Sequence, residues 1–325
     1  MQNNCAIIGY GDFTRNCTIP SLNTTKRFKI KYILVRSAER AVELNALNKD
    51  SDTLFVNSYE RILNDDEVKS VFIVTRHDKH KEQILQAVRA GKAVFTEKPM
   101  AMNLVDAEEI AAEVKDTGVK LMVGFNRRFS PFALEIKSIL QNIQGPFLIN
   151  YRWINQAWEA RWPFDLVEGG GKLVSSGCHM LDLVMFLLGD VPVSVDSELK
   201  TMIKEDIDTH DTASVRLQFQ DGSTANICTS ELGAVNYPQE KIEIFTRQGV
   251  IVLDNFKHLS FYGINKGDIC LDQQNKGFVE EMYQFADYLE KDNVSPCSVD
   301  AGVNIAKCTE ACQLSAEKGC RISIN

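Results

Sequence analysis

The run Cys5-Ala-Ile-Ile-Gly9-Tyr-Gly11-Asp12-Phe13-Thr14 decides the fold of the first part of the chain. Its apolar half predicts a short buried strand, and the residues that follow predict a helix. Glycines at such a junction let the backbone turn tightly and approach a pyrophosphate group, which the start of a helix attracts. An ordinary tight turn is the alternative, because Thr14 replaces the third glycine of the dinucleotide-binding pattern. The candidate cofactor-binding residues of this turn are Gly9, Gly11, Asp12 and Phe13.

Apolar segments alternate with helical patterns from this turn up to about residue 124. We expect strands at Cys5–Gly9, Lys31–Val35, Val71–Thr75, Ala93–Thr96 and Lys120–Val123. We expect helices at Ala38–Leu47, Lys79–Ala90 and Leu104–Asp116. This alternation predicts an α/β domain, a Rossmann fold with a doubly wound parallel sheet, over residues 1–124.

The pattern changes in residues 125–325, for which we predict a second, α+β domain. Asp221-Gly222 is a hairpin signal between two strands of an open, mainly antiparallel sheet with helices on one face. The alternating segments are Thr212–Phe219, Ser223–Thr229, Lys241–Thr246, Val250–Leu253 and Leu259–Tyr262. The expected helices run from Pro131 to about Ile143 and over Ser176–Leu188, Phe278–Leu289 and Ala301–Lys318, with the last two able to pack back on the first domain.

Composition excludes several classes of protein. The 325 residues are more than one hydrophobic core usually serves, and the net charge of -8 argues against nucleic-acid binding. No apolar run is long enough to span a bilayer, and the N-terminus does not resemble a signal peptide. Nine cysteines without a framework spacing indicate free thiols in the cytoplasm, and their pattern predicts no metal site.

The end of the second expected strand bears on the choice of cofactor. Proteins that bind NAD usually have an acidic residue there, whereas this chain has Arg36-Ser37. An arginine can pair with the 2′-phosphate of NADP. We therefore predict that NADP is preferred over NAD, the alternative being that Arg36 is a solvated surface residue.

The run Ala93-Val-Phe-Thr-Glu97-Lys98-Pro99 places a lysine where a buried strand ends. Ligands of doubly wound sheets bind at the carboxyl ends of the strands. A lysine beside a cationic nicotinamide would have its ammonium form disfavoured, which makes it available for proton transfer. The alternative is a surface lysine in a loop.

Five motifs together resemble the glucose–fructose oxidoreductase / inositol dehydrogenase (Gfo/Idh/MocA) family over nearly the whole chain. These motifs are Gly9-x-Gly11, the turn Thr75-Arg76-His77-Asp78-Lys79-His80, Glu97-Lys98-Pro99, the run Gly124-Phe-Asn126-Arg127-Arg128-Phe129, and Gly169-Gly-Gly171 followed by His179 and Asp182. In the second motif, Arg76 and His77 replace the proline and asparagine that the family has.

The resemblance implies hydride transfer at a secondary alcohol or ketone of a sugar, sugar nucleotide or cyclitol. It implies that Lys98 donates or accepts the proton at the reacting oxygen and that His179 is its catalytic partner. Glu97 and the turn that contains Thr75, His77 and His80 would face the cofactor, and Asn126 would lie near the substrate. The alternative for His179 is a purely structural role, with its ring satisfied by a hydrogen bond to the backbone or to Asp182.

Two further segments are candidates for substrate binding. The loop Trp153–Trp162 contains all three tryptophans, and Trp158 and Trp162 could stack on a sugar while Arg161 pairs with an anionic group. The alternative is that Trp153 is a core residue of a strand and that the other residues only cover the sheet. Of Arg127 and Arg128, we expect one to close the interdomain cleft and the other to lie in solvent.

Ser175 stands where the family usually has an aspartate, so it could orient the substrate but could not take up a proton as a carboxylate does. This departure favours an activated or modified sugar over inositol. A lyase, hydratase or glycosidase that uses NAD transiently, and a non-catalytic NAD(P)-binding regulator, remain alternatives to a dehydrogenase. The resemblance also implies a homodimer or homotetramer formed through the open sheet.

Overall fold

The computed structural model describes residues 2–49, 51–157, 160–203, 207, 209–291 and 294–324. The chain divides into two compact units. Unit 1 comprises Met1–Ala101, Val105–Gly124 and Phe278–Val303. Unit 2 comprises Met102–Leu104, Phe125–Gly277 and Asn304–Asn325. A segment late in the sequence, Phe278–Val303, therefore belongs with the N-terminal residues.

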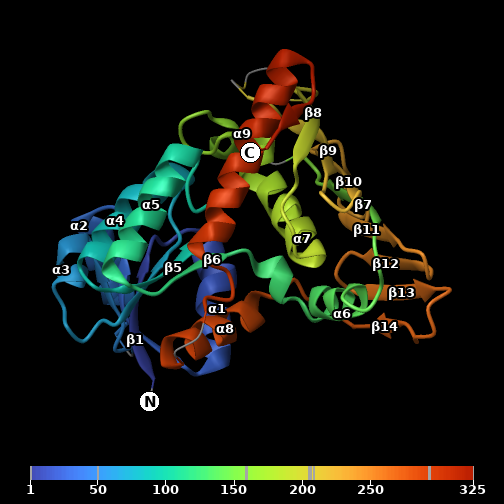
Figure 1. Cartoon of the computed structure of the whole chain (residues 1–325). Coiled ribbons are helices and arrows are strands. Elements are labelled where there is room, and N and C mark those ends of the chain that lie inside the picture. The colour runs from blue at the N-terminus through green and yellow to red at the C-terminus, as the bar shows by residue number, and fades with distance from the viewer. Residues whose placement is uncertain are drawn as a thin grey trace. The chain divides into compact units, whose positions relative to one another are not determined.

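Unit 1 is built on a parallel sheet whose strands are connected by helices (Figure 1). Its strands are β1 (Asn3–Ile8), β2 (Phe28–Leu34), β3 (Leu54–Val56), β4 (Ser70–Ile73), β5 (Ala93–Glu97) and β6 (Leu121–Gly124). Its helices are η1 (Thr14–Thr18), α1 (Ile19–Thr25), α2 (Ala38–Leu47), α3 (Tyr59–Leu63), α4 (His77–Arg89), α5 (Leu104–Thr117) and α8 (Phe278–Glu290).

The strand order β3-β2-β1-β4-β5-β6 reverses direction between β1 and β4. This is the order of a Rossmann fold, in which ligands bind at the carboxyl ends of the strands where the order reverses. β1 and β4 are buried nearly throughout because α4 and α5 cover one face of the sheet and α1 and α8 cover the other (Figure 1). The predicted Rossmann fold is confirmed.

Phe285 of α8 fills the core of unit 1. Its ring centroid lies 5.4 Å from that of Phe72 in β4, 5.6 Å from Phe95 in β5 and 6.0 Å from Phe28 in β2. Arg27 also pairs with Asp287 of the same helix at 3.2 Å. α8 is thus an integral part of unit 1.

Unit 2 contains a mixed sheet of nine strands and the helices that cover it. Its strands are β7 (Leu148–Ile154), β8 (Ser194–Lys200), β9 (Thr212–Gln218), β10 (Thr224–Ser230), β11 (Glu240–Phe245), β12 (Val250–Asp254), β13 (His258–Tyr262), β14 (Ile269–Cys270) and β15 (Ile322–Ser323). Its helices are η2 (Asn126–Phe129), α6 (Pro131–Leu140), η3 (Trp162–Phe164), η4 (Leu173–Gly177), α7 (Cys178–Leu188) and most of α9 (Val299–Lys318).

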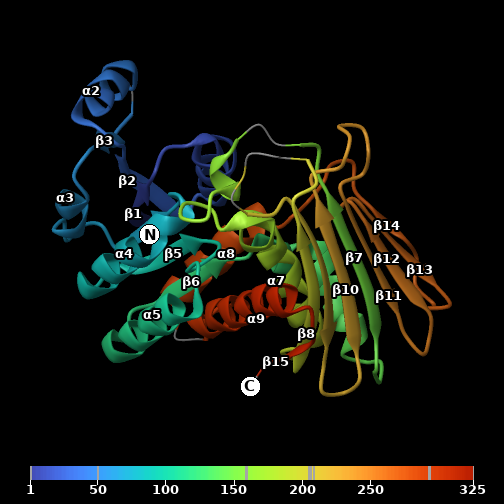
Figure 2. The same ribbon diagram turned by 90° about the horizontal axis from the view of Figure 1, so that it is seen from above.

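The sheet of unit 2 follows the order β14-β13-β12-β11-β7-β10-β9-β8-β15. β7 and β10 pair in parallel, and every other described pair in this sheet is antiparallel. Residues of β9 and β10 alternate between buried and exposed positions, which leaves one face of these strands in solvent. α7 and α9 lie on the other face (Figure 2). The predicted open, mainly antiparallel sheet is confirmed.

Several elements differ from the sequence-based expectation. β3, β8, β14 and β15 were not expected, because three of them have only two or three residues and β8 is mostly polar. The helix that begins at Pro131 ends at Leu140 rather than at about Ile143. These differences change no predicted layer of either unit.

Candidate active site

The glycine turn after β1 fits closely against the end of β4. Gly9 has φ +107, and a Cβ there would lie 2.8 Å from the carbonyl oxygen of Val74. Only glycine can adopt this conformation at such a distance without strain. A Cβ on Gly11 would meet nothing within 4 Å, so the backbone at Gly11 borders open space, as a pyrophosphate-binding turn requires.

Thr14 takes the place of the third glycine and is fully buried. Its hydroxyl donates a 3.1 Å hydrogen bond to the carbonyl oxygen of Gly9. The chain continues from Thr14 into the π-helical segment η1, which precedes α1. The threonine therefore fastens the turn through its side chain, and the turn remains compatible with a dinucleotide.

His80 joins the loops that follow β4 and β5. Its Nδ1 lies 2.8 Å from the carbonyl oxygen of Pro99, and its Nε2 lies 3.1 Å from that of Thr75. Burial lowers the pKa of His80, and the hydrogen bonds to the carbonyls of Pro99 and Thr75 oppose this shift. His80 thus holds the two loops together through their backbone, which accounts for a histidine at this position of the turn.

The other predicted cofactor residues of unit 1 surround these loops. The hydroxyl of Thr75 donates to the side-chain oxygen of Gln83 at 2.6 Å, and His77 is buried at the start of α4. Lys98 is partly exposed directly after β5, and its peptide bond to Pro99 is cis. Glu97 is only 7% exposed, and burial, opposed by Lys98, raises its pKa to about 7.

The residues predicted to select between NAD and NADP follow β2, which lies on the other side of β1 from β4 and β5. Arg36 is exposed after β2, and the hydroxyl of Ser37 accepts a hydrogen bond from the backbone N–H of Arg40, which caps α2. Asp12 forms an ion pair with Arg15. Phe13 is 38% exposed and contacts Phe278 edge to face, with ring centroids 5.7 Å apart.

In unit 2, His179 is buried in the first turn of α7 beside two aromatic rings. Its ring centroid lies 5.9 Å from that of Trp153 in β7 and 6.1 Å from that of Phe125. Ser175 is buried one turn earlier, in the π-helical segment η4. Asp182 accepts hydrogen bonds from Arg128, with Nε to Oδ2 at 3.1 Å.

The expectation for the arginine pair was wrong, because neither guanidinium lies in solvent. Arg127 is 3% and Arg128 is 9% exposed. Arg127 donates from Nε and Nη2 to Glu240 of β11, at 2.9 and 2.7 Å, and Arg128 pairs with Asp182 as described. Each arginine is neutralised by a carboxylate within unit 2, so both are part of its interior.

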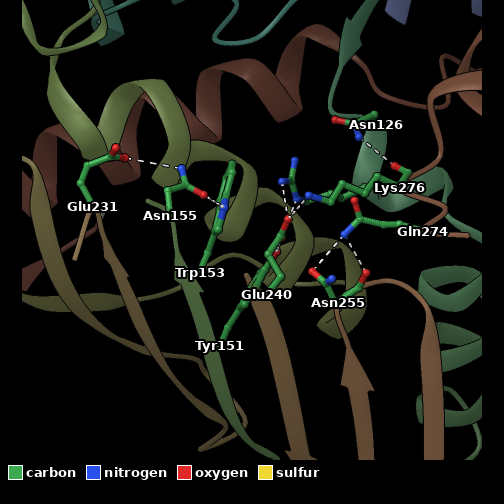
Figure 3. A network of polar contacts seen from close by, with 10 residues as sticks. Asn126, Tyr151, Trp153, Asn155, Glu231, Glu240, Asn255, Gln274 and Lys276 are labelled. Atoms are coloured by element: carbon green, nitrogen blue, oxygen red, sulfur yellow. Dashed lines mark hydrogen bonds and ion pairs between the residues drawn. The ribbon is translucent and has the colours of Figure 1, made fainter. Parts of the chain in front are cut away.

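Glu240 is the centre of a buried polar network (Figure 3). It also accepts from the ammonium of Lys276 at 2.6 Å and from the hydroxyl of Tyr151 at 2.8 Å. Burial alone would raise the pKa of Glu240, but Arg127 and Lys276 outweigh it and hold the pKa at about 2. Asn126 donates from its side chain to the carbonyl oxygen of Lys276 at 2.8 Å, so the predicted substrate residue belongs to the edge of this network.

Trp153 connects the network to His179. Three cations surround its ring: the guanidinium carbon of Arg127 lies 4.2 Å from the ring centroid, and the ammonium nitrogens of Lys172 and Lys276 lie 5.5 and 5.8 Å away. Cations favour the electron-rich face of an indole. The indole N–H donates to Asn155 at 2.7 Å, which fixes the ring plane beside His179.

The glycine run Gly169–Gly171 brings a buried lysine to this site. A Cβ on Gly169 would lie 2.3 Å from the carbonyl oxygen of Trp162, and one on Gly171 would lie 2.8 Å from the ring of His210. The next residue, Lys172, is 1% exposed and forms an ion pair with Glu231 of the segment after β10. The run is therefore glycine-rich because it is packed on both sides.

His210 fixes the start of η4 by accepting a 3.0 Å hydrogen bond at Nε2 from the backbone N–H of Leu173. Burial lowers the pKa of His210 to about 4, which keeps this nitrogen unprotonated. Sequence reasoning missed His210, Lys172, Glu231, Glu240 and Lys276. Only Lys172 carried a signal, its position directly after the glycines.

The predicted aromatic loop is described in part. Trp158 lies outside the described residues. Arg161 is exposed, and Trp162 is half-buried at the start of η3. Because Lys98 belongs to unit 1 and His179 to unit 2, the convergence of the two side chains stays a prediction.

Two features are absent from the described residues. Among them, no group of three or more histidine, cysteine, aspartate or glutamate side chains could hold a metal ion. No helix in the described part of the chain has the length and apolar character needed to cross a membrane.

Comparison with known proteins identifies the family. Residues 3–125 match the oxidoreductase family with an NAD-binding Rossmann fold, and residues 146–252 match the GFO/IDH/MocA C-terminal domain. The chain belongs to the Gfo/Idh/MocA family. It is therefore an NAD-binding oxidoreductase, as its motifs predicted.

Individual members of the Gfo/Idh/MocA family resemble the chain over most of its length. Inositol 2-dehydrogenase of Rhizobium meliloti is 30% identical over 270 residues, which are 78% of this chain and 80% of that protein. The uncharacterized oxidoreductase YrbE of Bacillus subtilis is 27% identical over 82% of both chains. The solved structure of levoglucosan dehydrogenase in complex with NADH and levoglucosan superposes with a TM-score of 0.87 over all of both chains, at 21% identity.

Proposed function

We propose that the protein is a dehydrogenase or reductase that acts on a secondary alcohol or ketone of a sugar, sugar nucleotide or cyclitol. The cofactor, when bound, donates or accepts the hydride. The observation that carries the proposal is the joint presence of a glycine turn open at Gly11, a lysine at the exit of β5 and a buried histidine at the start of α7.

Lys98 is assigned the proton transfer at the reacting oxygen. It follows a strand end that His80 fixes through Pro99, and a fixed backbone limits where its ammonium group can move. His179 is assigned to orient or share this proton. The rings of Phe125 and Trp153 pack against its imidazole, and Ser175, one turn earlier, supplies a hydroxyl where the family usually has a carboxylate.

The substrate is assigned to the carbohydrates and cyclitols. Relatives named inositol 2-dehydrogenase and levoglucosan dehydrogenase support this class. Trp162 and Arg161 are the described candidates for contacts with the ring and with an anionic substituent, and Asn126 for a hydroxyl. Arg127 is assigned a supporting role behind the substrate, because its guanidinium already binds Glu240 and packs on the ring of Trp153.

NADP is proposed as the preferred cofactor. Arg36 is exposed directly after β2, and an arginine there can pair with a 2′-phosphate, whereas the acidic residue usual in NAD enzymes would repel it. Titration of both cofactors against the wild type and Arg36→Ala tests this. The variant should lose affinity for NADP by about tenfold or more and keep its affinity for NAD. Equal binding of the two cofactors by the wild type contradicts the preference.

A cytoplasmic homodimer or homotetramer is proposed as the working form. The outward face of the nine-stranded sheet has a concave pocket with a volume of about 770 Å³. It is lined by side chains of both charges, among them Arg152, Asp196, Arg216 and Glu243, so a second copy could cover it with matched charges. Light scattering of the wild type and of Arg216→Glu tests this assembly.

The activity is tested by screening sugars, sugar nucleotides and cyclitols with NAD and NADP, read by the absorbance of the reduced cofactor. Lys98→Ala should lower turnover by roughly two to four orders of magnitude while the affinity for cofactor changes little. Turnover that stays near the wild-type value would remove Lys98 from the mechanism. Substrate conversion without net change in the reduced cofactor would instead identify a lyase or glycosidase that uses NAD transiently.

A further inference from the structure

Glu281 of α8 is the most unusual ionisable residue of unit 1. Its side chain is fully buried, and neither carboxyl oxygen has a hydrogen-bond partner among the described residues. Buried polar groups nearly always have a partner, and an isolated buried carboxylate is strongly disfavoured. An acidic residue in the first turn of a helix interacts favourably with the helix dipole. This role does not explain the burial of Glu281, because the adjacent Glu280 is in the same turn of α8 and is partly exposed.

The packing of α8 on β5 brings Glu281 to the carboxyl ends of the strands, where the cofactor is proposed to bind. Residues four apart share one face of a helix, so Glu281 and Phe285 lie on the same face of α8. Residues two apart share one face of a strand, so Phe95 and Glu97 lie on the same face of β5. The rings of Phe95 and Phe285 are in contact, with centroids 5.6 Å apart. Glu97 is the residue next to Phe95 on its face of β5, and Glu281 is the residue next to Phe285 on its face of α8.

The electrostatics agree with this placement. Burial and the neighbouring Glu97 carboxyl raise the pKa of Glu281 well above its ordinary value. The charged groups that act on the two carboxyls are Lys98, which acts on Glu97, and Glu280, which acts on Glu281. Cys17 of η1 lies near both, because burial and the two glutamates raise the pKa of its thiol. Lys98 is the one cation among these groups.

We propose that Glu97 and Glu281 are coupled electrostatically, so that one of the two carboxyls is protonated at neutral pH, and that this proton is released to solvent when the oxidised, cationic cofactor binds. Two buried carboxyls side by side cannot both ionise without a compensating positive charge. The nicotinamide ring carries such a charge when oxidised and loses it when reduced. Glu281 is therefore a positioning residue, which acts through Glu97 and makes the charge of this site follow the oxidation state of the cofactor.

This inference rests on the proposed function, which assigns Glu97 to the nicotinamide side of the cofactor. A first test uses the cofactor-free protein. Infrared spectroscopy of the full chain at pH 7 should show the band of a buried protonated carboxyl, which Glu281→Gln and Glu97→Gln should each remove. Glu280→Gln, one residue away on α8, is the matched control and should retain it. Absence of the band in the wild type overturns the proposal.

A second test counts protons with a pH indicator in weak buffer. Adding the oxidised cofactor to the wild type should release up to about one proton per chain, and adding the reduced cofactor should release none. Glu281→Gln should abolish the difference between the two cofactors, and Glu280→Gln should preserve it. Equal proton release with both cofactors contradicts the inference, whereas failure of either cofactor to bind contradicts the proposed function itself.

Discussion

Arg127 donates two hydrogen bonds to the carboxylate of Glu240, although 113 residues separate them in the sequence and both side chains are buried. Lys276 contacts the same carboxylate at 2.6 Å. One carboxylate therefore compensates two buried cations. Both cations, those of Arg127 and Lys276, also lie near the ring of Trp153. The interior of unit 2 depends on the charge at position 240.

Glu240→Gln should lower the free energy of unfolding by about 3–5 kcal/mol, because it leaves buried cations without their counter-charge. Urea denaturation followed by circular dichroism measures this change. Glu243→Gln is the control: it lies on the same strand, is half-exposed and pairs with Lys241 at 3.3 Å, so its loss should cost less than about 1 kcal/mol. Similar destabilisation by the two substitutions would refute the role of Glu240.

Gly9 and Gly11 should respond differently to alanine. Gly9→Ala should destabilise the protein by about 1–3 kcal/mol, because its φ is +107 and its Cβ would approach Val74. Gly11→Ala should leave stability within about 1 kcal/mol of the wild type, since its Cβ meets nothing, but should weaken cofactor binding at least about tenfold. Thermal unfolding and cofactor titration on both variants separate the two effects.

His80→Phe should weaken cofactor binding by about tenfold, because the loops after β4 and β5 lose the ring nitrogens that hold them. The ring shape is retained, so most of the packing of α4 should survive. Lys79→Ala on the same helix, whose side chain is 62% exposed, is the control and should bind normally. Fluorescence titration gives the affinities, and wild-type affinity in His80→Phe would show that the two contacts do not position the site.

The stability of unit 2 should fall as the pH drops from about 6.5 toward 4. The pKa of His210 is about 4 in the folded protein and near its ordinary value of 6.5 when unfolded, so the unfolded chain binds the proton first. This difference corresponds to on the order of 3 kcal/mol, present above pH 6.5 and lost at pH 4. His210→Asn should flatten the dependence between pH 7.5 and 5, and exposed His258→Gln should not alter it.

Much of the fold follows from hydrophobic periodicity. The helix expected at Ala38–Leu47 has those bounds, and the strands β9 to β13 lie within two residues of the segments expected for them. β8 was missed because its sequence, Ser194–Lys200, has few apolar residues and depends on pairing with β9. Strands of this kind are determined by their neighbours rather than by their own composition.

The candidate site was predictable only where a short motif marks it. Glu97-Lys98-Pro99 and Gly169–Gly171 are contiguous and therefore visible in one sequence. Glu240, Lys276 and Glu231 carry no local signal, because each is defined by a partner far along the chain. The same distance explains the wrong expectation for Arg127 and Arg128: exposure is the usual state of an arginine, and their carboxylate partners could not be foreseen.

The place of α8 in unit 1 has a consequence for biosynthesis. Ribosomes deliver the chain from the N-terminus, so β1 to β6 emerge more than 150 residues before Phe285, which completes their core. Until then the rings of Phe28, Phe72 and Phe95 lack the side chain that covers them in the finished protein. We therefore expect the nascent N-terminal half to bind chaperones, and a gene truncated after residue 124 to yield an aggregation-prone product.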